Sequence, residues 1–398
     1  MHRAVLSLAA VIVTAVTMCW PRQVFSHETL TTTVLFDREI VRILNSHCVM
    51  CHVDGGPSFP LETYEQTWVR GRKIRAAVLS SHMPPWAAVP GYGQFVNENI
   101  VTLRESQFVV SWVEGLGPRN AGTVFTNTAG SSAGTRQAVR AHGDFGRWRL
   151  GEPSLTRRFE PVTVEPDRAN DVKRTVVDLG LTSARRVRAV EYIPGDRRVV
   201  RAAFFTVQET GQWIGSWTPW YGFVALPAGV AFALPAGSHI VAEIHYQHVK
   251  ESVVDSGTLG LFYADQPLSR PVADMVIEAK GSVPAGAGAQ RFHAETVLAA
   301  ETAVLALRPE ALPGIRSVEV TARKPDGGSD VLLFAKDIPV EWPTPYIFKN
   351  AVVLPSRTAL SVTAYYVNPG TAPMAAGVRL TASIYRPARL SRSNRQKR

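Results

Sequence analysis

The chain has little cysteine: Cys19, Cys48 and Cys51 are its three thiols among 398 residues. So few thiols exclude a disulfide framework. The sequence also lacks G-x-S-x-G, H-E-x-x-H, Walker and dinucleotide-binding motifs, and its acidic residues show no pairing suited to catalysis. These absences remove several common enzyme classes and leave two closely spaced thiols as the main chemical signal.

Long hydrophobic runs are absent beyond the N-terminus. The apolar run 6–20 follows a basic start and is short for a membrane span, and residues of small or modest size stand at 24–26. We therefore predict a signal peptide over residues 1–26 and export, to the periplasm in a bacterium. A membrane anchor that is not cleaved, with Cys19 as a lipid-modified residue, is the alternative. A cleaved chain would keep only Cys48 and Cys51.

The overall composition is that of a folded protein, with 45% hydrophobic and 19% charged residues. The formal net charge of +10 owes much to the C-terminus. Six basic residues lie close together there: Arg386, Arg389, Arg392, Arg395, Lys397 and Arg398. This tail is not a nucleic-acid-binding face, and we expect a solvated terminus. Contact with anionic lipid or an acidic redox partner is the alternative.

The pentapeptide 48–52, Cys-Val-Met-Cys-His, is typical of covalent haem attachment. In such a site two thiols bond to one porphyrin and the adjoining imidazole binds the iron. Zinc would need further ligands of the same kind, and a C-x-x-C redox motif does not need the histidine. We predict one haem c bound through Cys48 and Cys51, with His52 as an axial iron ligand.

A second axial ligand is expected in the segment 81–86, Ser-His-Met-Pro-Pro-Trp. Met83 is preferred over His82, because the two following prolines stiffen a loop that would present the thioether at a fixed distance. A thioether ligand raises the reduction potential and blocks access to the iron. Met83 therefore favours an electron carrier over a catalyst.

The chain divides by its patterns into a helical part and a β part. Capping boxes at Thr63 and Thr102 predict helices before residue 119, and alternating β-branched segments predict many short strands after residue 148. We predict a small all-α cytochrome c domain followed by an all-β, two-lobed sandwich. The predicted units are 1–26 (signal peptide), 27–119 (cytochrome c domain), 120–147 (flexible linker), 148–270 and 271–388 (sandwich lobes) and 389–398 (basic tail).

Five separated motifs resemble the small bacterial cytochrome c domain that is fused to copper monooxygenase-like domains. They are the segments 43–52, 59–64, 83–86, 91–93 and 112–115. In that family the two cysteines bind haem, the histidine is an axial ligand, and the Met of the Met-Pro-Pro-Trp segment is its partner. The resemblance implies these roles for Cys48, Cys51, His52 and Met83.

The segments 148–153, 187–195 and 234–246 resemble the ascorbate-dependent type II copper monooxygenases related to peptidylglycine hydroxylase. The resemblance implies a two-lobed β-sandwich. Most copper ligands of that family are missing, because Arg201-Ala202 replaces a His-His pair and Gln247 replaces the second His of a His-x-His pair. His245 is the one matched remnant, so we expect no copper and no catalytic residue.

These observations predict an exported monohaem electron carrier whose β region is not catalytic and docks or positions the haem for a redox partner protein or oxidoreductase. One alternative is a copper monooxygenase supplied with electrons by its own haem. Another is a binding or assembly module whose haem is structural. An aromatic cluster formed by Trp213, Trp217, Trp220 and Tyr221 is expected to pack between the sheets, or to line a pocket.

Overall fold

The computed structural model describes residues 32–56, 58–120, 146–166, 171–247, 249–265, 270–340, 342 and 344–388. The predicted signal peptide, the basic tail and all of the predicted linker except residues 120, 146 and 147 lie outside these described residues. None of the helices within the described ranges combines the length and apolar character needed to span a membrane.

Short helices form the N-terminal part of the described chain. They are η1 (Phe36–Ile40), α2 (Val41–His47), α3 (Tyr64–Trp68), α4 (Gly71–Leu79) and α5 (Leu103–Glu114). Both predicted capping boxes are present, at Thr63 before α3 and Thr102 before α5. The predicted helix 63–79 is divided in two, because residues 69–70 separate α3 from α4. Phe36, Leu44 and Trp112 are buried in a small core that these helices share.

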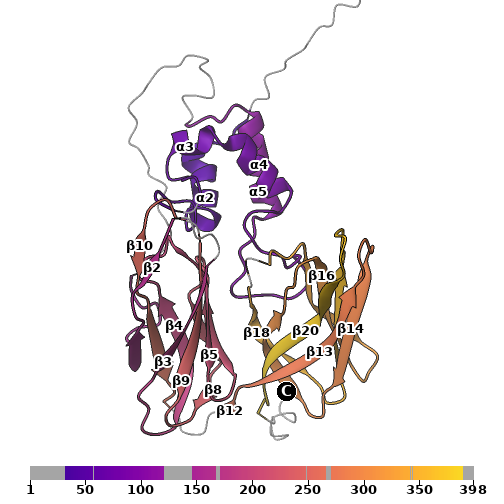
Figure 1. Cartoon of the computed structure of the whole chain (residues 1–398). Helices are drawn as coiled ribbons and strands as arrows, with labels where there is room; N and C mark the ends of the chain where they lie inside the picture. The colour runs from indigo at the N-terminus through magenta and orange to yellow at the C-terminus, as the bar shows by residue number, and fades with distance from the viewer. Residues whose placement is uncertain are drawn as a thin grey trace, which may run out of the picture.

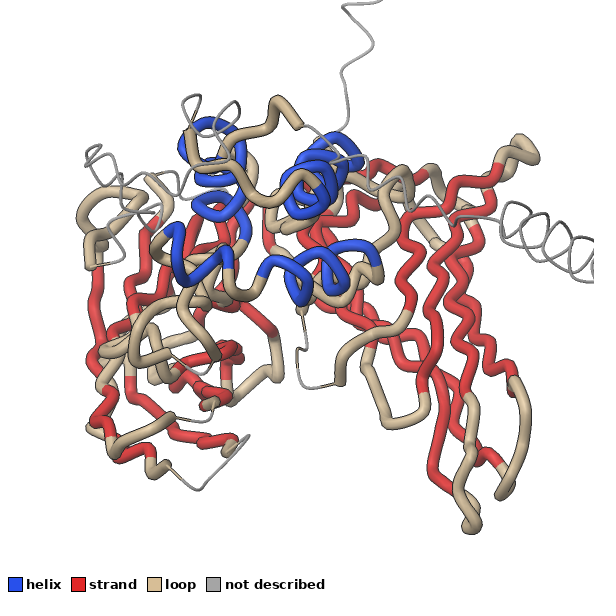
Figure 2. Tube along the Cα trace, turned by 90° about the horizontal axis from the view of Figure 1, so that it is seen from above, coloured by secondary structure: helices blue, strands red, loops and turns tan. Residues whose placement is uncertain are grey.

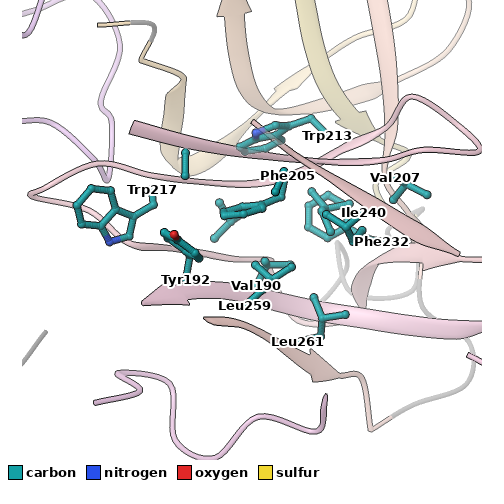
Figure 3. Packing of buried hydrophobic residues seen from close by; sticks show 14 of the residues in the cluster. Val190, Tyr192, Phe205, Val207, Trp213, Trp217, Phe232, Ile240, Leu259 and Leu261 are labelled. Carbon is teal, nitrogen blue, oxygen red and sulfur yellow. The ribbon is translucent and has the colours of Figure 1, made fainter. Parts of the chain in front are cut away.

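The first sandwich contains twelve strands. They are β1 (Leu155–Arg158), β2 (Val162–Val164), β3 (Val172–Asp178), β4 (Arg185–Ile193), β5 (Val200–Val207), β6 (Trp213–Trp217), β7 (Phe223–Ala225), β8 (Val230–Leu234), β9 (His239–Tyr246), β10 (Val253–Asp255), β11 (Thr258–Tyr263) and β12 (Arg270–Pro271). One sheet has the order β1-β11-β4-β8-β12, with β7 on β4, and the second has the order β3-β9-β5-β6. Large side chains from both sheets, among them Tyr192, Phe205 and Trp217, fill the space between them (Figure 3).

The second sandwich contains eight strands in two four-stranded antiparallel sheets. They are β13 (Ala273–Val283), β14 (Gln290–Val297), β15 (Thr302–Pro309), β16 (Ile315–Arg323), β17 (Ser329–Lys336), β18 (Tyr346–Leu354), β19 (Ala359–Tyr366) and β20 (Met374–Tyr385). The sheet orders are β13-β20-β15-β18 and β14-β19-β16-β17. The two sandwiches stand side by side, and the helices lie across one end of the pair (Figure 1). The view from above places the helices over the region where the sandwiches meet (Figure 2).

The segment between α4 and α5 decides how the fold is classified. Its chain is extended, and it forms β-bridges between Ala88 and Ala335 and between Phe95 and Phe348. Trp86, Ala88 and Phe95 are buried in the core of the second sandwich. The predicted fold class, a small all-α cytochrome domain followed by a sandwich, is therefore wrong: the protein is mostly β-sheet with a few short helices, and no separate all-α domain is evident.

Candidate thiol and imidazole site

The turn after α2 brings two thiols together. The Cys51 amide donates to the Cys48 carbonyl at 3.0 Å, and the His52 amide donates to the same oxygen at 2.9 Å. Such a turn holds the Cα atoms of its first and fourth residues within about 7 Å, a range that overlaps the Cα separations of disulfides. Both cysteines are free and half-buried. The two sulfur atoms are therefore placed where they can form a bond after a small adjustment.

A cavity of about 140 Å³ adjoins this turn. The predicted site residues Cys48, Cys51, His52 and Met83 all line it. The remaining lining comes from α4, the segment before α5 and the two sandwiches: His47, Ser58, Phe59, Leu61, Lys73, Ile74, Ala77, Val78, Pro84, Pro85, Asn99, Val101, Trp220, Gln247 and Trp342. Soft sulfur, imidazole and aromatic groups thus share one mostly apolar enclosure.

His52 has a defined protonation pattern in this enclosure. Its Nδ1 lies 2.9 Å from the Phe59 carbonyl oxygen, which can only accept, so Nδ1 carries the proton and Nε2 keeps its lone pair. The Phe59 ring packs 4.9 Å from the imidazole, centroid to centroid. Burial lowers the pKa of His52, which keeps the ring neutral. His52 can therefore accept a proton or a hydrogen bond at Nε2.

The two thiols are strongly biased toward their protonated form. Burial raises the pKa of Cys48 to about 12, and nearby Cys51 and Glu105 raise it further. Burial also raises the pKa of Cys51 to about 12, although Arg197 opposes this shift. A thiolate is the reactive form in thiol exchange, so these thiols are slow nucleophiles at neutral pH.

A loop of the first sandwich supports the thiol turn. Nη2 of Arg197 donates to the carbonyl of Val49, inside the turn, at 3.4 Å. Arg198 forms a two-pronged pair with Asp196, at 2.5 to 3.1 Å, and its carbonyl accepts from Nε2 of Gln247 at 2.8 Å. Gln247 is only 7% exposed. The β region therefore fixes the loop that touches the thiol turn.

The segment after α4 separates the two candidates for the second ligand. Met83 lines the thiol cavity, whereas His82 is exposed and does not. The side chains of Trp220 and Trp342 close the cavity from the sandwiches, with their rings 6.0 Å apart. Of the predicted aromatic cluster, Trp213 and Trp217 are buried in the first sandwich core, while Trp220 lines the cavity.

His245 lies away from the thiols. On β9 its Nε2 is 2.8 Å from Oε1 of Glu243, and its ring packs edge-on against Phe204. It does not line the thiol cavity. Among the described residues, no three His, Cys, Asp or Glu side chains gather in a way that could hold a metal ion. The predictions of metal binding and of an iron centre at His52 and Met83 are thus contradicted.

The sequence matches no family model and no curated protein. Similar solved structures include the major capsid protein P2 of bacteriophage PM2, with 9% identity over 58% of this chain and 99% of that chain, and a TM-score of 0.28. PNGase F, a glycosylasparaginase from Flavobacterium meningosepticum, has 14% identity over 57% of this chain and 96% of that chain, and a TM-score of 0.25. Scores this low carry no argument about function.

These findings correct the predicted family and cofactor. Neither structure is a cytochrome or a monooxygenase, and no helical haem-binding domain is evident. The thiol cavity, at about 140 Å³, is the size of cavities that hold a benzene molecule, so a porphyrin does not fit it. The resemblance to a cytochrome c fused to a monooxygenase-like domain is not upheld, and the prediction of haem c is wrong. Cys48, Cys51, His52 and Met83 nevertheless meet in one place, which makes them the candidate site.

Proposed function

We propose that the protein is an exported electron-transfer protein whose redox couple is the Cys48–Cys51 thiol pair, and that its β region positions the pair and docks a redox partner. The observation that carries this proposal is the hydrogen-bonded turn, which holds two free thiols at disulfide range beside an apolar cavity.

The proposed chemistry uses only the chain's own residues. Oxidation removes the two S–H protons and two electrons and forms one S–S bond between Cys48 and Cys51. The electrons pass to a partner oxidoreductase, and reduction reverses each change. His52 lines the same cavity with an unprotonated Nε2, so it is the proposed acceptor of a thiol proton.

The raised pKa of both thiols shapes how such a couple behaves. With few thiolates present at neutral pH, exchange with small thiols in solution is slow. A thiol of high pKa is also a poor leaving group, which makes the disulfide resistant to reduction. Such a couple favours exchange with a docked partner over random exchange, and an exported, oxidising compartment suits it.

The β region contributes position and needs no catalytic group of its own in this proposal. Arg197 and Gln247 hold the loop against the thiol turn, and Trp220 and Trp342 close the cavity. A partner that reaches the half-buried thiols must therefore contact the surface around this junction.

The test is a thiol count on exported protein. The chain is produced with its export signal, purified, and measured by thiol titration and intact mass with and without a strong reductant. We expect two reactive thiols after reduction and none after oxidation, with a mass difference of two hydrogen atoms. Cys51→Ser should leave one thiol that cannot be hidden by oxidation, and Cys19→Ser serves as the matched control that changes neither count in cleaved protein.

The proposal fails if reductant releases no thiol from the exported chain. A mass larger than that of the mature polypeptide would then show that both sulfur atoms are held in other covalent bonds.

A further inference from the structure

A second, larger cavity lies next to the thiol site. This cleft has a volume of about 860 Å³ and lies between the N-terminal segment and both sandwiches. The segment 80–90 forms one wall, β5 contributes Arg201, and the stretch after β17 contributes Lys336, Asp337 and Trp342. Met83, Pro84, Pro85 and Trp342 line both the cleft and the thiol cavity. The volume is in the range of sites that bind small organic molecules.

Arg201 gives the cleft a buried positive charge. It is only 6% exposed, and its guanidinium carbon lies 5.8 Å from the centre of the Trp342 ring. Lys336 adds a second cation at the mouth, where it is exposed, and Asp337 is the single carboxylate among the lining residues. The charge balance of the lining therefore favours an anion.

The other walls favour an apolar body attached to that anion. Val78, Pro84, Pro85 and Ile100 offer aliphatic surface, and Trp342 offers an aromatic face. A planar guanidinium binds a carboxylate through two parallel hydrogen bonds, and it keeps its charge at all accessible pH values. A partly desolvated site strengthens such a pair relative to water.

We propose that the cleft binds a small organic carboxylate with an aromatic or aliphatic body, with Arg201 contacting the carboxylate and Trp342 the body. Because Trp342 and Met83 belong to both cavities, the bound molecule would lie against the wall of the thiol site. The proposal concerns binding alone and does not depend on thiol redox chemistry.

The experiment measures binding of naphthoate to the purified mature chain by calorimetry and tryptophan fluorescence, with the neutral amide of the same ring system as the comparison. We expect naphthoate to bind and the amide to bind about tenfold or more weakly, since a charge-assisted hydrogen-bond pair is lost. Arg201→Gln should remove this preference and Arg201→Lys should keep part of it. Arg291→Gln is the matched control, because Arg291 is exposed on β14, away from the cleft.

Two further variants keep the result interpretable. Lys336→Met, at an exposed position, should weaken naphthoate binding by a few-fold even if Arg201→Gln does not fold. The double variant Cys48→Ser, Cys51→Ser should bind naphthoate as the unmodified chain does, which separates this proposal from the redox proposal. No binding at millimolar naphthoate, or equal binding of naphthoate and amide, would overturn the assignment.

Discussion

The two sandwiches hold the N-terminal segment by different kinds of contact. The second sandwich buries Trp86 and Phe95 in its own core, where both rings pack against Tyr346. The first sandwich contacts the same segment through polar groups: Arg197 donates to Val49, and Trp220 donates to the carbonyl of Asn97 at 3.0 Å. One interface is a shared hydrophobic core, and the other is a set of directed hydrogen bonds.

This difference separates stability from site geometry. Buried aromatic area contributes several kcal/mol per side chain, whereas a single hydrogen bond has a net contribution of about 1 kcal/mol. The second sandwich should therefore anchor the N-terminal segment, and the first should set the local environment of the thiols. Substitutions on the two sides should then differ both in magnitude and in the property that they change.

The largest expected effect is the loss of the apolar anchor. Phe95→Ala should lower the free energy of unfolding by about 3–5 kcal/mol, because a buried ring is replaced by a cavity between Trp86, Tyr346 and Phe348. Urea unfolding followed by tryptophan fluorescence measures this change. Tyr92→Ala is the matched control: its ring is 40% exposed against Phe334, so a loss of about 1 kcal/mol or less is expected.

An equal loss in both variants would contradict the shared core. It would mean that the segment 86–95 rests on the surface of the second sandwich.

A smaller effect belongs to a polar pair within the first sandwich and depends on pH. Hydrogen bonds from His245 first, and then from Arg174, lower the pKa of Glu243 to about 2. Since this folded-state pKa lies below the ordinary value of 4.5, the pair stabilises the fold above about pH 4.5, and this contribution is lost as the pH falls toward 2. Glu243→Gln should remove about 1–2 kcal/mol at pH 6 and less at pH 3.

Thermal unfolding of Glu243→Gln across this pH range measures the effect. Glu295→Gln, which breaks a more exposed pair with Arg323, should leave the pH dependence unchanged. A constant difference between Glu243→Gln and the unmodified chain at all pH values would contradict the linkage.

Sequence reasoning was right where the signal is local. The capping boxes at Thr63 and Thr102 satisfy backbone groups within three residues, and the alternating segments around Val187 and Ile240 became β4 and β9. The path of residues 86–95 could not be predicted in this way, because its partner strands lie about 250 residues further along the chain. Pro84 and Pro85 indicate the end of a helix but not the surface that receives the chain.

The candidate site divides along the same line. The thiols and His52 are adjacent in the sequence, so their meeting was predictable. Met83 was selected for its stiff flanks, and it does line the same cavity. Trp220, Gln247 and Trp342 carry no local signal for this role, since only the packing of both sandwiches against the N-terminal segment brings them there. The size of the cavity, which excludes the predicted haem, also depends on these distant residues.

The cap of α5 tests a contact that is local to the N-terminal segment. Thr102→Ala should lower the free energy of unfolding by about 1 kcal/mol, because the Glu105 amide loses its acceptor and the box is broken. Urea unfolding measures the loss, and Thr102→Ser, which keeps the hydroxyl, should restore most of it. No loss in Thr102→Ala would show that tertiary packing alone fixes the start of this helix.

The smallest effect on stability, and the sharpest on the site, is expected at Arg197. Its positive charge opposes the burial that raises the pKa of Cys51, and its hydrogen bond to Val49 is long. Arg197→Gln should change the free energy of unfolding by no more than about 0.5 kcal/mol, yet slow the alkylation of Cys51 by iodoacetamide on the order of threefold at pH 8.5, because the thiolate fraction falls. The rate is measured on reduced Cys48→Ser protein, so that Cys51 is the thiol observed. Arg197→Lys should keep the rate near that of the parent, while Arg188→Gln, at an exposed position on β4, should leave it unchanged. A large loss of stability in Arg197→Gln with an unchanged alkylation rate would reverse the comparison, since the first sandwich would then anchor the N-terminal segment without tuning its thiols.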